Sequence, residues 1–229
     1  RTSCTKTNLA DATKYYFKVV PYFSSSSKTY ISKTYKTASI YTLRNLATPS
    51  KVTLSLYGHD DVNISWSKVP NATGYYVYFK KYGDSSYTLI GRTTKTYCKK
   101  ANLADGSKYY FKIVPYYVVN SKIYRDDSYK TASIYTLKKV SAPSVTKYNN
   151  SKVKVSWSNI NGETGYEISM STSKTGTNIV SRYATTTGKS KNLSVKKGKT
   201  YYYKIRAYTT VGNKRIYAPW SNVKSFKLK

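Results

Sequence analysis

The sequence predicts an all-β protein built from β-sandwich modules that follow one another along the chain. Two observations predict this class. Tyrosine, threonine, valine and isoleucine, which suit pleated and half-buried strands, are frequent, and 28 of the 229 residues are tyrosine. The chain also repeats itself with a period of 91–94 residues, which is the size of one self-contained β-sandwich.

The repeat is visible in two places. Residues 4–50 align without a gap on residues 98–144, and 28 of the 47 aligned pairs are identical. A more distant copy follows, in which Trp66 corresponds to Trp157 at an offset of 91. These copies are too long for the units of a solenoid, so we expect each of them to have its own core.

Prolines mark the expected module boundaries. Pro49 and Pro143 each precede a fresh strand, where proline suits the edge of a sheet. We therefore expect a half-module at 1–46, a central module at 47–140 and a C-terminal module at 141–229. The short linkers predict a rod of abutting modules. Because the half-module holds only the final strands of a sandwich, we expect the first half to exist in the parent protein.

Short alternating runs at a spacing typical of sandwiches predict the strands of the central module. The expected strands are Val52–Leu56, Val62–Trp66, one through Tyr75, Val77 and Phe79, residues 87–90, one through Tyr109, Phe111 and Ile113, and one within 130–137. In the half-module the corresponding strands are a segment around Cys4, residues 15–22 and residues 35–43.

Three motifs of the central module resemble the fibronectin type III pattern. They are Trp66 on the second strand, Gly74-Tyr75-x-Val77 on the third, and Leu103-x-Asp105-Gly106-Ser107-x-Tyr109. The resemblance implies a seven-stranded, two-sheet, immunoglobulin-like sandwich, in which Trp66 and Trp157 are equivalent and buried.

The last motif implies a tyrosine corner, in which a tyrosine hydroxyl holds a loop by a hydrogen bond. Tyr15, Tyr109 and Tyr201 match its position. The proline that is usual within this motif is replaced in all three copies, by Asp11, Asp105 and Lys197. Residues 200–229 also resemble repeats of large surface proteins of Gram-positive bacteria, which implies an extracellular protein, secreted or attached to the cell surface.

The inventory of reactive side chains does not favour an enzyme. His59, the single histidine, lies in a predicted turn at 58–61 without a cysteine or serine motif, and we expect it to be solvated. The nine carboxylates lie mostly in predicted loops, and the pairs Asp60-Asp61 and Asp126-Asp127 lack the ladder of oxygen ligands of an EF-hand. We therefore predict no catalytic residue, no metal site and no cofactor.

The two cysteines are repeat-equivalent, so Cys4 and Cys98 belong to different modules and an intramodule disulfide is not expected. The absence of a CxxC or a Cys/His cluster argues against zinc. Cys98 is interpreted as a small buried thiol of the core, with a reactive or intermolecular thiol as the alternative.

Strand alternation predicts an outward face that is rich in tyrosine and lysine. Its expected binding residues are Tyr76, Tyr78, Lys80, Tyr110, Lys112 and Tyr116 in the central module, and Tyr202, Lys204, Arg206 and Tyr208 in the C-terminal module. In the half-module, Tyr16, Lys18, Val20 and Tyr22 continue the pattern. Such a face suits stacking on sugars or bases and contact with proteins. The alternative is that these tyrosines only support cross-strand pairing.

The formal charge of +31 favours association with polyanions, although lysine also keeps β-proteins soluble and protects edge strands. Two functions remain open. The first is a spacer or stalk of a bacterial surface protein, associated with an anionic cell-wall polymer. The second is an adhesin-type module that binds a host protein, including immunoglobulin, or a glycan.

Two further partners are not expected. The charge is spread along all modules, which does not favour specific nucleic-acid recognition. No apolar run approaches the roughly 20 residues of a membrane span. The other modules of the parent chain are the remaining expected partners.

Overall fold

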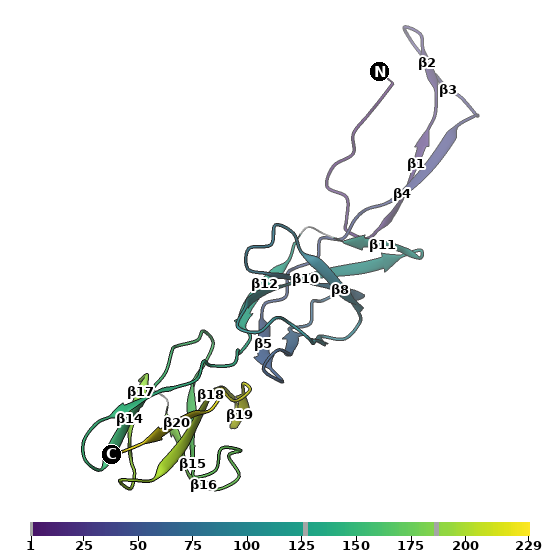
Figure 1. The fold of residues 1–229 in the computed structure, drawn as a ribbon. Helices are drawn as coiled ribbons and strands as arrows, with labels where there is room; N and C mark the ends of the chain where they lie inside the picture. Colours follow the sequence, from purple (N-terminus) through teal and green to yellow (C-terminus); the bar gives the residue numbers. More distant parts are fainter. Residues whose placement is uncertain (1, 126–127, 186–187) are drawn as a thin grey trace.

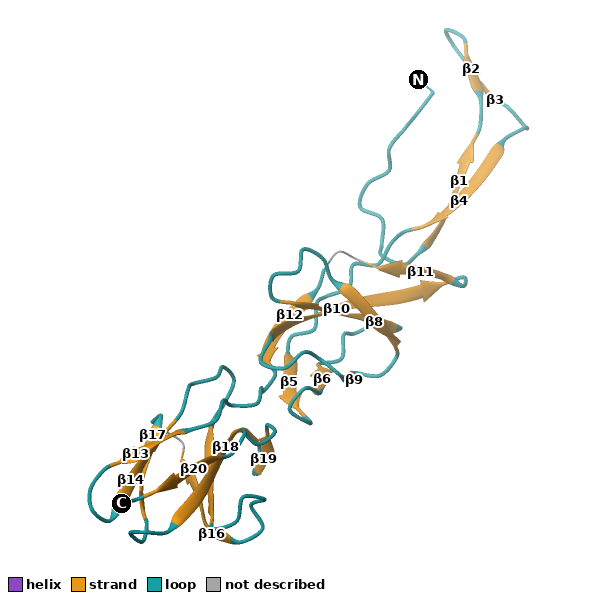
Figure 2. Ribbon diagram, viewed as in Figure 1, coloured by secondary structure: helices purple, strands orange, loops and turns teal. Residues whose placement is uncertain are grey.

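The structure, a computed structural model, describes residues 2–125, 128–185 and 188–229. The three parts of the chain follow one another end to end, and the two termini lie at opposite ends of the molecule (Figure 1). All the regular elements of the described residues are strands (Figure 2). None of these residues belongs to a helix that is long and apolar enough to cross a bilayer. The predicted pair Asp126-Asp127 lies outside the described residues.

The central module is a sandwich of two antiparallel sheets. The smaller sheet has the order β5-β6-β9, with β5 at Val52–Leu56, β6 at Val62–Trp66 and β9 at Tyr97–Lys100. The larger sheet has the order β11-β10-β7-β8, and β12 also pairs with β10. Its strands are β7 (Gly74–Lys81), β8 (Thr88–Thr93), β10 (Lys108–Val119), β11 (Lys122–Arg125) and β12 (Lys130–Tyr135).

The long strand β10 has two successive partners along one edge. Its first half pairs with β12, from Lys108 to Ile113, and its second half pairs with β11. Asn120 and Ser121 join β10 to β11 with φ of 48° and 60°, as a two-residue hairpin turn requires. Strands β11 and β12 thus occupy the same position beside β10. The eight strands of the module therefore fill the seven positions of the sandwich.

The C-terminal module repeats this arrangement. Its smaller sheet has the order β13-β14-β17, with strands at Ser144–Lys147, Lys152–Ser156 and Ser190–Ser194. Its larger sheet has the order β16-β15-β18-β19, with β20 beside β18. These strands are β15 (Gly165–Ser171), β16 (Ile179–Thr185), β18 (Thr200–Val211), β19 (Lys214–Tyr217) and β20 (Lys224–Lys227).

The half-module consists of two hairpin-like pairs. Strand β1 (Lys14–Val19) pairs with β4 (Lys36–Tyr41), and β2 (Tyr22–Ser24) pairs with β3 (Thr29–Ile31). The register of β1 on β4 is that of β10 on β12, because Tyr15 faces Ile40 as Tyr109 faces Ile134. These pairs extend away from the central module (Figure 1).

The predicted strand around Cys4 is wrong. Residues 2–10 have no regular structure, and Cys4 is exposed. In the central module the equivalent Cys98 lies on β9, where it pairs with Ile64 of β6. Among the described residues 2–46, no strand is a counterpart of β6, so the segment around Cys4 has no ladder to join.

The other strand predictions differ from the structure mainly at their ends. Strands β5 and β6 have the predicted bounds, and β8 begins and ends later than expected, at Thr88 and Thr93. Strands β9 and β11 are not among the strands predicted for this module, because Tyr97–Lys100 and Lys122–Arg125 are too short to show an alternation of their own. The inward residues Tyr109, Phe111 and Ile113 are buried as predicted, and so are Trp66 and Trp157.

Candidate functional site

All three predicted tyrosine corners are present. The Ala104 amide donates a hydrogen bond to the Tyr109 hydroxyl at 2.9 Å, and the Lys196 amide donates one to Tyr201 at 3.3 Å. In the half-module, the Ala10 amide donates to the hydroxyl of Tyr15 at 2.8 Å. In each case the tyrosine lies five residues after the donor, so the hydroxyl holds the loop that leads into its own strand. The missing proline has not removed the corner.

The outward face of the larger central sheet brings together the predicted tyrosines and lysines of two neighbouring strands. Across β7 and β10, Tyr78 pairs with Lys112, and Lys80 pairs with Tyr110. These four side chains and Tyr76 are half-buried. Tyrosine and lysine therefore alternate across the strands as well as along them, which sets each cation beside a ring.

Lys112 lies among three tyrosine rings. Its Nζ is 4.8 Å from the ring centroid of Tyr78, 4.8 Å from that of Tyr87 and 5.0 Å from that of Tyr129. Tyr78 comes from β7, whereas Tyr87 and Tyr129 come from the segments that precede β8 and β12. A cation within about 6 Å of several ring centroids is held by the ring quadrupoles. Burial, with the neighbouring Tyr129 and Tyr110 as lesser causes, raises the pKa of the Tyr87 phenol.

Two arginines extend this arrangement. The Arg125 guanidinium lies 5.6 Å from the Tyr76 ring centroid and donates from Nη1 to the Tyr78 hydroxyl at 2.9 Å. Arg92 lies 5.7 Å from the ring centroid of Tyr116. Sequence reasoning missed Tyr87, Tyr129, Arg92 and Arg125, because they lie on other strands or loops and only the folded register places them on this face.

The expected accessibility of Tyr116 and Tyr208 is wrong. Tyr116 lies on the outward face, with its ring centroid 5.2 Å from that of Tyr76, but only 5% of it is exposed. The reason is the glycine opposite: Tyr116 pairs with Gly74, and a Cβ on Gly74 would lie 2.5 Å from the tyrosine hydroxyl. Tyr116 therefore lies flat on the sheet.

Tyr208 of the C-terminal module repeats this packing. It is paired with Gly165, is 1% exposed, and its hydroxyl would lie 2.6 Å from a Cβ on that glycine. Val114, which strand alternation also places outward, is buried as well. These three residues offer little surface to a ligand.

The equivalent face of the C-terminal module has different chemistry. Glu167, which takes the place of Tyr76, is paired with Arg206 at 2.6 Å and is buried. The Arg206 guanidinium also lies 3.6 Å from the ring centroid of Tyr217 and 4.4 Å from that of Trp220. Lys204 lies 4.9 Å from Trp220, and Tyr202 is half-buried. This face is thus closed over an internal ion pair.

In the half-module the outward residues are the most accessible of the three copies. Tyr16 and Tyr22 are exposed, and Lys18 Nζ lies 3.9 Å from the ring centroid of Tyr35. Only the pair of β1 and β4 supports them, since no equivalent of β7 lies beside β1 among the described residues.

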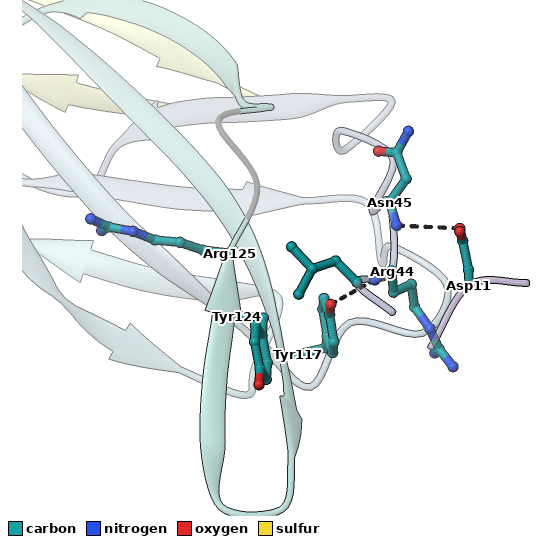
Figure 3. Close-up of a pocket in the computed structure, with 7 residues that line it drawn as sticks. Asp11, Arg44, Asn45, Tyr117, Tyr124 and Arg125 are labelled. Atoms are coloured by element: carbon teal, nitrogen blue, oxygen red, sulfur yellow. Dashed lines mark hydrogen bonds between the residues drawn. The ribbon is translucent and has the colours of Figure 1, made fainter. Parts of the chain in front are cut away.

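A pocket lies where the half-module meets the central module (Figure 3). The Arg44 amide donates a hydrogen bond to the Tyr117 hydroxyl at 2.6 Å, and the Asn45 amide donates to Asp11 at 3.4 Å. Tyr117 and Tyr124 stack with centroids 5.4 Å apart, whereas the side chains of Arg44 and Arg125 point away from each other. These contacts hold the linker between the half-module and the central module. The pocket is therefore part of the junction between the two modules.

The side chain of His59, which was predicted to be solvated, is 34% exposed and also contacts two carboxylates. Its Nδ1 lies 3.0 Å from Asp105 and 3.4 Å from Asp60, so the turn at 58–61 is tied to the loop of the tyrosine corner. Among the described residues, the ligand atoms of His59, Asp60 and Asp105 lie close enough together to share a metal ion. The His59 Nδ1 contacts one oxygen of each carboxylate, Oδ1 of Asp60 and Oδ1 of Asp105.

Cys98 occupies a partly buried position against the core of the central module. Burial raises the pKa of its thiol to about 11, so the thiol is protonated at neutral pH. The interpretation as a core thiol agrees with this environment.

No family model and no curated protein sequence matches the chain. Among solved structures, the chain is similar to the FN1–FN3 domains of chicken CNTN1, with 20% identity and a TM-score of 0.37, over 96% of this chain and 80% of that chain. It is also similar to a segment of two fibronectin type III domains from chicken tenascin, with 14% identity and a TM-score of 0.40, over 78% of this chain and 98% of that chain.

Proposed function

We propose that this all-β chain of fibronectin type III-like modules is a non-catalytic, extracellular spacer of a bacterial surface protein, and that its surface associates with an anionic polymer of the cell wall. The proposal rests on the large positive charge of the chain, which few carboxylates neutralise. The sequence has 40 lysines and arginines against nine carboxylates. Among the residues that the structure describes, Arg206–Glu167 is the one ion pair between a lysine or arginine and a carboxylate.

The way the modules are joined supports the role of a spacer. Leu46 and Val140, which occupy equivalent positions before the two modules, are both buried. At the second junction, Lys139 Nζ donates to the Asn222 side chain at 2.8 Å. Short linkers with buried anchors hold the modules end to end (Figure 1). Lysines and arginines occur in all three parts of the sequence, so the positive charge is distributed along the molecule.

The arrangement of reactive groups supports a non-catalytic role. The single histidine is held between two carboxylates in a turn. The buried carboxylate Glu167 is neutralised by Arg206, and the thiol of Cys98 is protonated. These groups are satisfied by contacts within the fold, which is what structural residues require.

The test is sedimentation with purified bacterial cell walls at increasing salt. We expect binding at low ionic strength that is lost near 1 M salt, where the Debye length is about 3 Å. Walls stripped of their anionic polymers should not retain the protein, and neither should protein whose lysines have been acetylated. Equal retention on stripped walls would overturn the proposal.

A further inference from the structure

We infer that the outward face of β7 and β10 in the central module is a binding site for an acidic sugar chain of the cell wall. This inference rests on the proposed function, and it names the surface and the chemistry through which the wall polymer is recognised. The site is formed by Tyr78, Lys80, Tyr110 and Lys112, with Tyr87 as its border.

The first argument is electrostatic. Lys80, Lys108 and Lys112 project from two neighbouring strands on the same face of one sheet. Among the described residues, none of the three lies within ion-pair distance of a carboxylate. Lys80 Nζ donates to the backbone carbonyl of Asp84, at 3.2 Å. A cluster of cations whose charge no described carboxylate neutralises attracts an anionic partner.

The second argument is that these cations are already held in place. Lys112 Nζ lies among the rings of Tyr78, Tyr87 and Tyr129, and Lys80 Nζ lies 5.2 Å from the Tyr87 centroid. Lys108 Nζ lies 5.2 Å from the ring centroid of Tyr110. Ordering a free lysine on binding costs conformational entropy, and a lysine that is already ordered costs less. The rings thus hold the lysine ammonium groups in place before a ligand binds.

The third argument decides between a sugar chain and a nucleic acid. Bases bind single-strand sites by stacking on free ring faces. Here Tyr76 is stacked with Tyr78 at 6.3 Å and lies 5.2 Å from Tyr116, and Lys112 covers a face of Tyr78. The Tyr78 hydroxyl already accepts a hydrogen bond from Arg125. A ligand on this face therefore meets the ammonium groups of Lys80 and Lys112, which hydrogen-bond to the hydroxyls and carboxylates of an acidic sugar.

The fourth argument comes from the other whole module. There Glu167, Ser169 and Ser171 stand at the β-strand positions of Tyr76, Tyr78 and Lys80, and all three are buried. Glu167 neutralises Arg206, and Tyr217 and Trp220 cover the guanidinium. The same fold therefore carries a cationic face in one module and a closed face in the next. Binding is assigned to the central module.

The experiment compares two pairs of substitutions that remove the same charge from the full chain. Lys80→Gln with Lys112→Gln changes the proposed site, and Lys191→Gln with Lys224→Gln is the matched control in the C-terminal module, where Lys191 Nζ lies 5.5 Å from the Tyr183 ring centroid. The probes are oligogalacturonate, which is a sugar chain with carboxylates, inorganic polyphosphate of equal charge, which has no sugar, and a thymidine oligonucleotide. Calorimetry measures affinity at a fixed ionic strength, and tryptophan fluorescence confirms that each variant is folded.

We expect the site variant to bind oligogalacturonate about tenfold or more weakly, the loss that follows from removing charged hydrogen bonds. The control should bind within about twofold of the unaltered chain, as surface charges remote from a site do. Lys112→Arg, which keeps the charge beside the rings, should retain binding.

Three results would overturn the inference. Equal losses in the two variants would mean that charge acts diffusely, which leaves the proposed function intact. Equal sensitivity of polyphosphate, or of a thymidine oligonucleotide, would mean that the site does not recognise sugar. If no chain binds either polymer or cell walls, the proposed function itself fails.

Discussion

Tyr15, Tyr109 and Tyr201 occupy the same position in three copies of one motif, yet their hydroxyls have different surroundings. The hydrogen bond from Ala104 to Tyr109 is partly buried, and the one from Ala10 to Tyr15 is exposed. The bond from Lys196 to Tyr201 is partly buried but longer, at 3.3 Å. A hydrogen bond contributes most when its loss leaves a buried donor without a partner, so the three corners should differ in strength.

We predict that Tyr109→Phe lowers the free energy of unfolding of the central module by about 1–2 kcal/mol. Tyr201→Phe should cost the C-terminal module less, and Tyr15→Phe should have little effect because water replaces its exposed bond. Amide hydrogen exchange in the full chain measures each module separately. Equal losses for Tyr15 and Tyr109 would contradict the role of burial.

Strands β1 and β10 show how elements of nearly the same sequence can differ in packing. Phe111 and Ile113 of β10 are 0% exposed, whereas the equivalent Phe17 and Val19 of β1 are 36% and 68% exposed. Strand β10 has β7 on one side and β12 on the other, with a second sheet beneath it. Strand β1 has only β4 as its partner among the described residues. A two-stranded pair of this kind buries too little apolar surface to offset the entropy of ordering it.

We therefore predict that the amides of β1 and β4 exchange with solvent at least about a hundredfold faster than those of β10 and β12. The measurement is hydrogen exchange on the monomeric 229-residue chain, in which β10 is the internal control. Sedimentation at the same concentration establishes that the sample is monomeric. Strong protection of β1 in a monomer would show that the half-module is stable without a second sheet.

At the scale of the whole molecule, the rod depends on how the two complete modules meet. Gly162 lies in a loop of the C-terminal module, where its φ is 85° and a Cβ would lie 2.6 Å from the Cβ of Tyr135. Tyr135 ends β12 of the central module. The junction therefore needs glycine at 162 both for the turn and for the close approach of the neighbouring module.

We predict that Gly162→Ala changes the angle between the two modules as well as their stability. Gly198→Ala is the matched control, because Gly198 has a φ of 79° but nothing within 4 Å of its Cβ position. Both should cost the C-terminal module about 1–2 kcal/mol through backbone strain. Only Gly162→Ala should alter the distance distribution from small-angle X-ray scattering, and an unchanged curve would show that Tyr135 does not set the junction.

The sequence by itself determined the features that depend on local pattern and on repetition. Alternation along β10 indicated that Tyr109, Phe111 and Ile113 point inward, because successive side chains of a strand face opposite sides. The motif that ends at Tyr109 indicated the corner, because the hydroxyl and its amide partner are only five residues apart. The outward placement of Tyr78 and Lys112 followed from the same alternation.

Only the tertiary structure decided which outward residues are accessible and what surrounds them. Tyr116 is buried because it lies over Gly74 on another strand. Tyr87 and Tyr129 reach Lys112 from separate loops, and the segment around Cys4 is not a strand because it has no neighbour. Each of these facts depends on contacts between residues far apart in the chain. The sequence of one strand does not show which residues the neighbouring strand places against it.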